Sequence, residues 1–153
     1  MTRVVRHPEG RQPDRNDRHP EGRQPDHRPE GSGARPLLDQ ARALLGRADP
    51  KTAGLWPRAA ALLARQALEE SLDTFWLARS LPLSSCPTRP QLLCLATYLP
   101  DASLAANVHH AWSALSDACH HHAYELAPTA QELGTLFDTV GDLLEVVEEG
   151  SAR

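Results

Sequence analysis

Hydrophobic residues are almost absent from the first 35 positions of this 153-residue chain, and that gap limits what the chain can fold into. The hydrophobic residues of that stretch are Met1, Val4, Val5 and Ala34, whereas about half of residues 36–153 are hydrophobic. The first segment therefore lacks the apolar surface that a core requires, and the second has enough for one domain. We expect a disordered tail over residues 1–35 and a folded domain over residues 36–150.

The tail consists largely of a unit that repeats every twelve residues. Arg6–Asp14 recurs unchanged at Arg18–Asp26, and a third, degenerate copy begins at His27. The unit is rich in Arg, Pro, Glu and Gly and has no apolar position on which repeats could stack, which is typical of a disordered segment rather than a solenoid. The identical copies also indicate a recent duplication. We hypothesise from this that the natural start codon lies downstream and that residues 1–33 are not translated.

Charge divides the chain at the same boundary. Residues 1–35 carry a net charge of +2 and residues 36–153 a net charge of −6, which together give the −4 of the whole chain. Because phosphate binding depends on clustered Lys and Arg, we expect no DNA binding, and any contact with RNA would have to be local. The three cysteines form no CxxC pair, and the longest apolar run is the six residues Ala59–Ala64. These features predict free thiols, no membrane span and a cytoplasmic protein.

Apolar residues of the second region recur at helical spacing, and no stretch alternates long enough with the period of two that a strand needs. The predicted helices are a short one after Pro36, a long one from Leu55 to about Arg79, a third from Pro90 to about Tyr98 and a fourth from Ala102 to about His122. A fifth begins at Thr129-Ala130-Gln131-Glu132, which has the pattern of a capping box. We therefore expect an all-α antiparallel bundle of four main helices plus a short N-terminal helix.

Five of the eight histidines belong to the fourth predicted helix, namely His109, His110, His120, His121 and His122. Imidazoles suit proton transfer at neutral pH, and Asp117 could orient a neighbouring ring. Alternatively, His110, Asp117 and His121 could hold a metal from one flank, although HxxxH spacing and paired cysteines are missing. In a third interpretation the histidines are structural, with His122 on the core-facing stripe. The residues themselves leave all three interpretations open.

A family resemblance favours the first of them. The long helix with Ala60–Glu69, followed by the Leu-polar-Asp-x-x-His sequence at Leu115–His120, resembles the HEPN superfamily over about residues 55–148. Members are small helical bundles, and many are metal-independent endoribonucleases of toxin or host-defence systems. They dimerise so that two Arg-x4–6-His motifs meet in a cleft. The resemblance implies an RNA substrate or a cognate protein partner, a homodimer, and neither a cofactor nor a metal ion.

Aligned on that motif, Asp117 matches the polar position and His120, His121 or His122 matches the histidine, but Ser116 stands in place of the arginine. The family arginine is expected to stabilise the charge of the scissile phosphate, which serine cannot do. Arg65 or Arg79 on the long helix could replace it, although Glu69 lies four residues after Arg65 and predicts an ion pair instead. The sequence thus predicts a weak or inactive endoribonuclease of an RNA-directed, toxin-antitoxin or host-defence system. The alternatives are a non-catalytic protein-interaction module and a metal-binding bundle.

Overall fold

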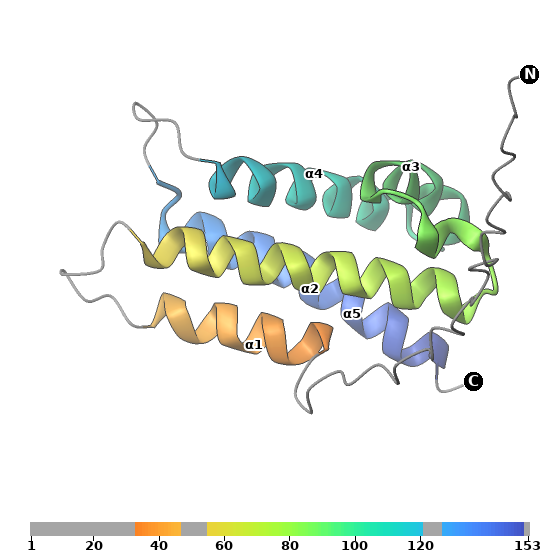
Figure 1. Ribbon diagram of the computed structural model, residues 1–153, viewed down its shortest axis with the longest axis horizontal. Helices are drawn as coiled ribbons and strands as arrows, with labels where there is room; N and C mark the ends of the chain where they lie inside the picture. The colour runs from red at the N-terminus through yellow and green to blue at the C-terminus, as the bar shows by residue number, and fades with distance from the viewer. Residues whose placement is uncertain (1–32, 47–54, 121–126, 152–153) are drawn as a thin grey trace, which may run out of the picture.

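The computed structural model describes residues 33–46, 55–120 and 127–151, and its regular structure there is helical throughout (Figure 1). The elements are α1 (Ala34–Leu45), α2 (Trp56–Ala78), the 3-10 helix η2 (Pro82–Ser85), α3 (Thr88–Tyr98), α4 (Ala102–Cys119) and α5 (Ala130–Ser151). The all-α prediction is confirmed for these ranges. Residues 1–32, which make up nearly all of the predicted tail, lie outside them. None of the helices seen in these ranges is long and apolar enough to cross a membrane.

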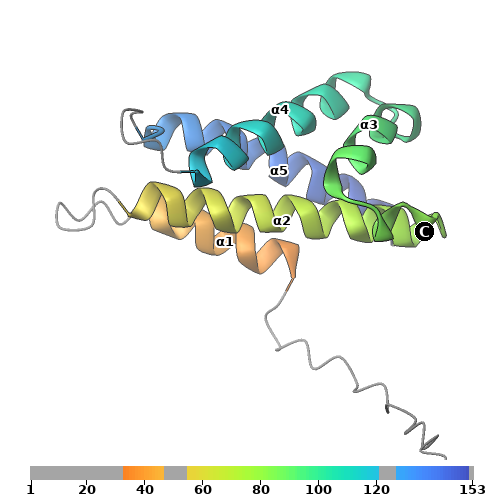
Figure 2. The same cartoon turned by 45° about the horizontal axis from the view of Figure 1, so that its top comes forward.

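Four helices lie side by side along the long axis of the molecule. Consecutive ones, α1 with α2 and α4 with α5, run in opposite directions, and α2 lies in the middle, in contact with the other three (Figures 1 and 2). The predicted antiparallel bundle is thus confirmed. Although α1 is short, it packs against both α2 and α5. The other short helix, α3, packs mainly on α4, near the end where α2 finishes and α4 begins.

Small residues on α2 allow its neighbours to approach closely. Ala60, Ala61, Ala64 and Ala67 are fully buried, as is Ala41 on α1. The large side chains gather towards the other end of α2, where the rings of Phe75 and Trp76 pack edge to face at 4.9 Å. Fully buried side chains from the remaining helices complete one continuous core: Leu38, Leu95, Val108, Leu115, Leu133, Phe137, Val140 and Leu143.

The start of α5 has the predicted capping box. The Thr129 hydroxyl accepts a hydrogen bond from the Glu132 backbone N–H at 3.2 Å, and the Glu132 carboxylate accepts one from the Thr129 N–H at 2.8 Å. The Thr129 N–H and hydroxyl lower the pKa of the Glu132 carboxyl. Two amides at the helix start are therefore satisfied by local side chains, as the sequence predicted.

The end of α2 is closed by a Schellman turn. The N–H of Leu81 bonds to the Trp76 carbonyl at 3.2 Å, and that of Ser80 to the Leu77 carbonyl at 3.0 Å. Ser80 has φ 54°, the left-handed conformation that glycine usually supplies at this position. The turn leads the chain into η2 and so determines where α3 begins.

Replacing Ser80 with glycine should stabilise the protein. The left-handed strain of an L-residue is removed, and the greater freedom of glycine in the unfolded chain offsets part of that gain, which leaves about 0.5–1 kcal/mol in the free energy of unfolding. Urea unfolding followed by circular dichroism measures it. Ser84→Gly in η2 is the matched control, because Ser84 has no positive φ to relieve. Equal effects of the two substitutions would contradict the assigned strain.

Candidate functional site

Helix α4 carries the candidate site residues, and it ends earlier than the sequence predicted. Its N-terminus is capped by Asp101, whose carboxylate accepts a hydrogen bond from the Ser103 N–H at 2.8 Å. Its last residue is Cys119, and the backbone of His120 is extended, with φ −84° and ψ 133°. The prediction of a helix to about His122 was therefore wrong, and His120 does not follow the helical spacing assumed for it. His121 and His122 lie outside the described residues.

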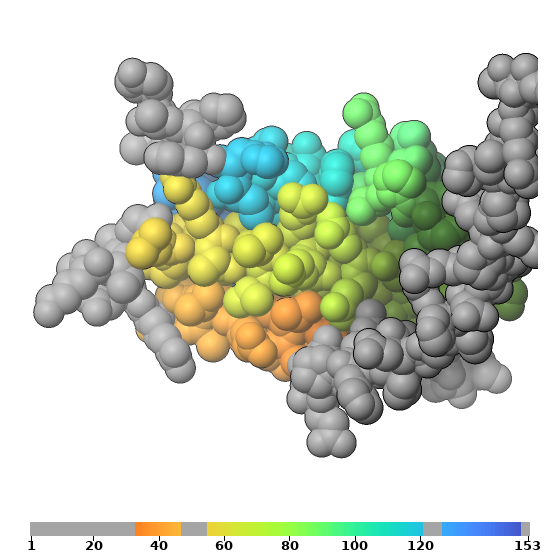
Figure 3. Space-filling view, in the orientation of Figure 1, coloured from red at the N-terminus to blue at the C-terminus, as the bar shows by residue number. Residues whose placement is uncertain are grey.

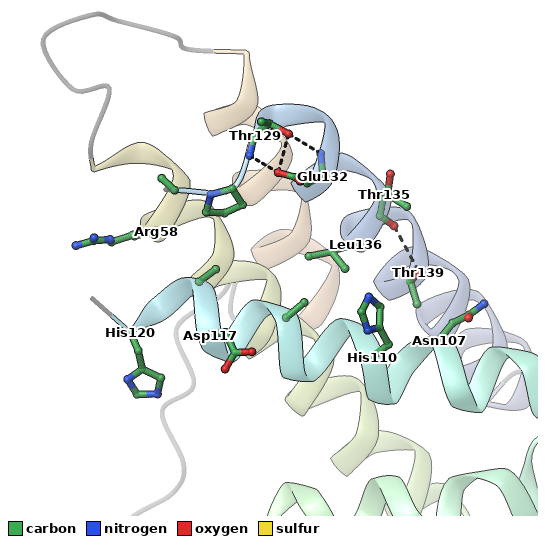
Figure 4. Close-up of a pocket in the computed structure, with 14 residues that line it drawn as sticks. Arg58, Asn107, His110, Asp117, His120, Thr129, Glu132, Thr135, Leu136 and Thr139 are labelled. Carbon is green, nitrogen blue, oxygen red and sulfur yellow. Dashed lines mark hydrogen bonds between the residues drawn. The ribbon is translucent and has the colours of Figure 1, made fainter. Parts of the chain in front are cut away.

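A groove of about 860 Å³ lies along α4 and α5, at the end where α4 finishes and α5 begins. Asp117 and His120 both line it, and so does His110 (Figure 4). Its other polar lining residues come from the start of α2, from α4 itself and from the facing side of α5: Arg58, Asn107, Thr129, Glu132, Thr135 and Thr139. Two of the candidate residues are thus brought to one open surface.

The candidate side chains do not point at one another. His110 is directed towards α5, whereas Asp117 and His120 project from the opposite side of α4 (Figure 4). The hydrogen bond between Asp117 and His120 is a backbone one, from the His120 N–H to the Asp117 carbonyl at 3.0 Å. The Asp117 carboxylate therefore does not orient the His120 ring in this arrangement.

Arg58 is a groove residue that the sequence analysis missed. It lies in the first turn of α2 and lines the groove together with His120 and Asp117. Figure 4 shows its side chain projecting from α2 at the same end of the groove as His120. The available signal was topological: because α2 and α4 run in opposite directions, residues at the start of α2 lie beside the end of α4. Arg58, two helical turns before Arg65, could have been added on that basis.

Arg65 lies instead on the side of α2 that faces α4. Its guanidinium is 3.0 Å from the Glu69 carboxylate, as the spacing of the two residues predicted, and 5.8 Å from the centroid of the Trp112 ring. It also lies beside the Cys119 thiol. Burial raises the pKa of that thiol more than the positive charge of Arg65 lowers it. Cys119 is therefore a protonated thiol rather than a nucleophile.

Glu69 joins three elements through one carboxylate oxygen. Its Oε1 accepts hydrogen bonds from Arg65 Nε at 3.0 Å, from Trp112 Nε1 at 2.9 Å and, more weakly, from the Thr88 hydroxyl at 3.5 Å. The donors belong to α2, α4 and α3. This carboxylate thus neutralises Arg65 and at the same time fixes α3 and α4 against α2.

Ser116 is the residue that the HEPN resemblance aligns with an arginine, and its hydroxyl is used within α4. It donates a hydrogen bond of 2.7 Å to the Trp112 carbonyl, one turn back. Arg79, the other proposed substitute, donates to the Phe75 carbonyl at 3.0 Å and stacks on the Phe75 ring at 3.5 Å, near the far end of α2. Neither Arg79 nor Ser116 supplies a cation to the groove.

The groove has little positive charge to offer a phosphate. Its charged lining residues are Arg58, Asp117 and Glu132, and the Glu132 carboxylate is occupied in the capping box. Within the described ranges, no three His, Cys, Asp or Glu side chains come close enough together to hold a metal ion. Comparisons of this chain with protein-family models, with curated proteins and with solved structures give no match.

Proposed function

We propose that this chain is a non-catalytic, HEPN-like bundle of an RNA-directed, toxin-antitoxin or host-defence system, and that it acts in the cytoplasm by binding a cognate protein. The observation that supports this proposal is that Arg65, the cation next to α4, already has partners within the chain. Arg65 is neutralised by Glu69 and stacked on Trp112, and Ser116 bonds within its own helix. A phosphoryl group at this site would lack the positive charge that its transition state needs. The three free cysteines support a reducing compartment.

A weak metal-independent endoribonuclease is the second candidate, and one observation favours it. His120 and Arg58 both line the open groove at the end where α4 finishes, and a rotation of the His120 ring about its side-chain bonds would be needed to turn it from the far side of α4 towards Arg58. Asp117 on the same groove carries a negative charge, which lowers the attraction for RNA. We therefore rank cleavage below partner binding.

Incubating the full chain with a mixed RNA pool in EDTA tests the two candidates. We expect no cleavage that depends on His120, because the arginine beside the motif, Arg65, is already neutralised by Glu69. His120→Ala, His121→Ala, His122→Ala and Arg58→Ala are compared with the parent chain, and His109→Ala serves as the matched control, since His109 does not line the groove. Cleavage lost in Arg58→Ala and in one histidine variant, but kept in His109→Ala, would establish the ribonuclease and overturn the non-catalytic proposal.

A further inference from the structure

Helix α3 is held to the bundle from one side. It packs on α4, α2 and η2, and its outer side is exposed, with Leu93 69% and Tyr98 44% accessible to solvent. Figure 3 shows α3 in green at the surface, next to α4 and α2. The inner side contributes Leu92 and Leu95 to the core. The attachment of α3 therefore depends on that inner side alone.

The side-chain hydrogen bonds that join α3 to α2 come from Gln91 and Thr88. Gln91 Nε2 donates to the Asp73 carboxylate at 2.9 Å, and the Thr88 hydroxyl donates to Glu69 Oε1 at 3.5 Å, which is long for such a bond. Gln91 also donates to the Cys86 carbonyl at 2.9 Å, but Cys86 belongs to the segment that leads into α3. Among the described residues, α3 is thus joined to α2 by one short side-chain hydrogen bond.

Two buried polar atoms at this contact lack a partner. The indole N–H of Trp76 and the Oε1 of Gln91 make no hydrogen bond within the part of the chain that the structure describes. Trp76 touches α3 directly, because its ring packs edge to face on the Tyr98 ring at 5.2 Å. A buried polar group without a partner disfavours the folded arrangement by roughly tenfold or more. Contact with water would satisfy both atoms.

The turn between α2 and η2 adds strain to the same region. Ser80 has φ 54°, and a left-handed conformation of this kind disfavours the turn as it stands. Trp76, Ser80 and Gln91 therefore place three unfavourable features in the connection from α2 to α3. Features of this kind persist only where the surrounding structure holds them, and they cluster in regions that switch between conformations.

We propose that η2 and α3, residues 82–98, form a unit that opens from the bundle while α1, α2, α4 and α5 stay folded. In the open form the unpartnered atoms of Trp76 and Gln91 bond to water, the turn at Ser80 relaxes, and the face of Trp76 that Tyr98 covers becomes accessible. The unit remains connected through the turn after α2 and through the extended residue Leu99 before α4. The fold thus contains a switch that exposes or covers the aromatic end of α2, and this opening does not depend on the proposed function.

Hydrogen exchange of the full chain, followed by mass spectrometry in urea below the unfolding transition, tests the proposal. We expect the amides of α3 to exchange faster than those at the centre of α2 by roughly tenfold or more, with little dependence on urea, because a local opening exposes little surface. Helix α1 is the internal control. It is also short, but it packs against both α2 and α5, and Arg35 donates two hydrogen bonds of 2.7 Å to Glu148. Equal rates in α1 and α3, or exchange of α3 through global unfolding alone, would overturn the proposal.

An isostere of Trp76 tests the cause of the opening. Benzothienylalanine has nearly the shape of tryptophan but carries sulfur in place of the N–H group. At position 76 it removes the unpartnered donor, so the exchange of α3 should become slower by roughly tenfold. The same replacement of Trp112 is the matched control, because Trp112 Nε1 donates to Glu69 at 2.9 Å and its loss weakens the bundle. Unchanged exchange of α3 in the first protein, or equal slowing in both, contradicts the proposal. Neither Trp76 nor Gln91 lines the groove on α4 and α5, so failure here would leave the RNA experiment unaffected.

Discussion

Glu69→Ala is expected to lower the free energy of unfolding by about 2–3 kcal/mol. The substitution removes the acceptor shared by Arg65, Trp112 and Thr88, and hydrogen bonds to a charged group contribute roughly 1.5–3 kcal/mol each when they are well formed. The full sum does not apply here. The Glu69 side chain is 30% exposed, which reduces the share of the Arg65 pair, and the Thr88 bond is long. Most of the loss comes from the indole N–H of Trp112, which is left without an acceptor.

Two further variants distinguish the loss of the Glu69 carboxylate from the general effect of a substitution on the stability of α2. Glu69→Gln keeps an oxygen for Trp112 but removes the charge, and it should cost about 1 kcal/mol. Glu70→Ala is the matched control and should change stability by less than about 0.5 kcal/mol, because in the described ranges the hydrogen bond that Glu70 accepts, from the Thr74 hydroxyl, goes to its backbone carbonyl. Urea unfolding gives the three values, and tryptophan fluorescence reports on the combined surroundings of Trp56, Trp76 and Trp112. Equal losses in Glu69→Ala and Glu70→Ala would contradict the joining role of Glu69.

Local features of the fold could be predicted because their causes lie within a few residues. The capping box at Thr129 and Glu132, and the ion pair of Arg65 with Glu69, depend on separations of three and four residues along one helix. The bounds of α2 were predicted to within one residue at either end for the same reason: Pro57 suits its first turn, and the apolar pattern continues without a break to the end. Such interactions need no knowledge of the tertiary structure.

The end of α4 could not be predicted in this way. Between Cys119 and Pro128 the sequence has no glycine or proline, and His, Ala, Tyr, Glu and Leu are all compatible with a helix. The helix nevertheless stops at Cys119, and the backbone of His120 is already extended. The signal that ends α4 therefore lies in the tertiary structure. Helix propensity alone made the predicted helix about one turn too long.

The candidate site was predicted only in part because its contacts are long-range. Asp117 and His120 do share a groove, but Trp112 reaches Glu69 across 43 positions of sequence, and no periodicity shows such a pair. The hydrogen bond that makes Glu69 the common acceptor explains why Arg65 is directed to the interface of α2 and α4. Arg58, which does line the groove, belongs to a helix that is distant in sequence and becomes relevant once the directions of α2 and α4 are known.

The position of Ser116 leads to the other large expected effect. Ser116 lies on α4 one turn after Trp112 and one turn before Cys119, and Arg65 is in contact with both of those neighbours. An arginine at this position would be partly exposed, would restore the arginine of the family motif and would add a guanidinium that Glu69 does not already neutralise. In enzymes, one preorganised electrostatic donor of this kind changes the rate by about 10²–10³.

The parent chain is expected to show only background cleavage, and Ser116→Arg is therefore expected to cleave RNA in EDTA at an initial rate about 10²–10³ above that background. His120→Ala, His121→Ala and His122→Ala are each combined with Ser116→Arg. The gain should disappear in one of the three double variants, and that variant identifies the histidine that handles the proton. Ser113→Arg is the matched control: it adds the same charge to an exposed position three residues earlier, outside the motif. Equal rates in the two arginine variants would mean that added charge alone promotes cleavage. If Ser116→Arg is folded and does not cleave RNA, the missing arginine is not what separates this chain from the nucleases, and the HEPN-like assignment fails with it.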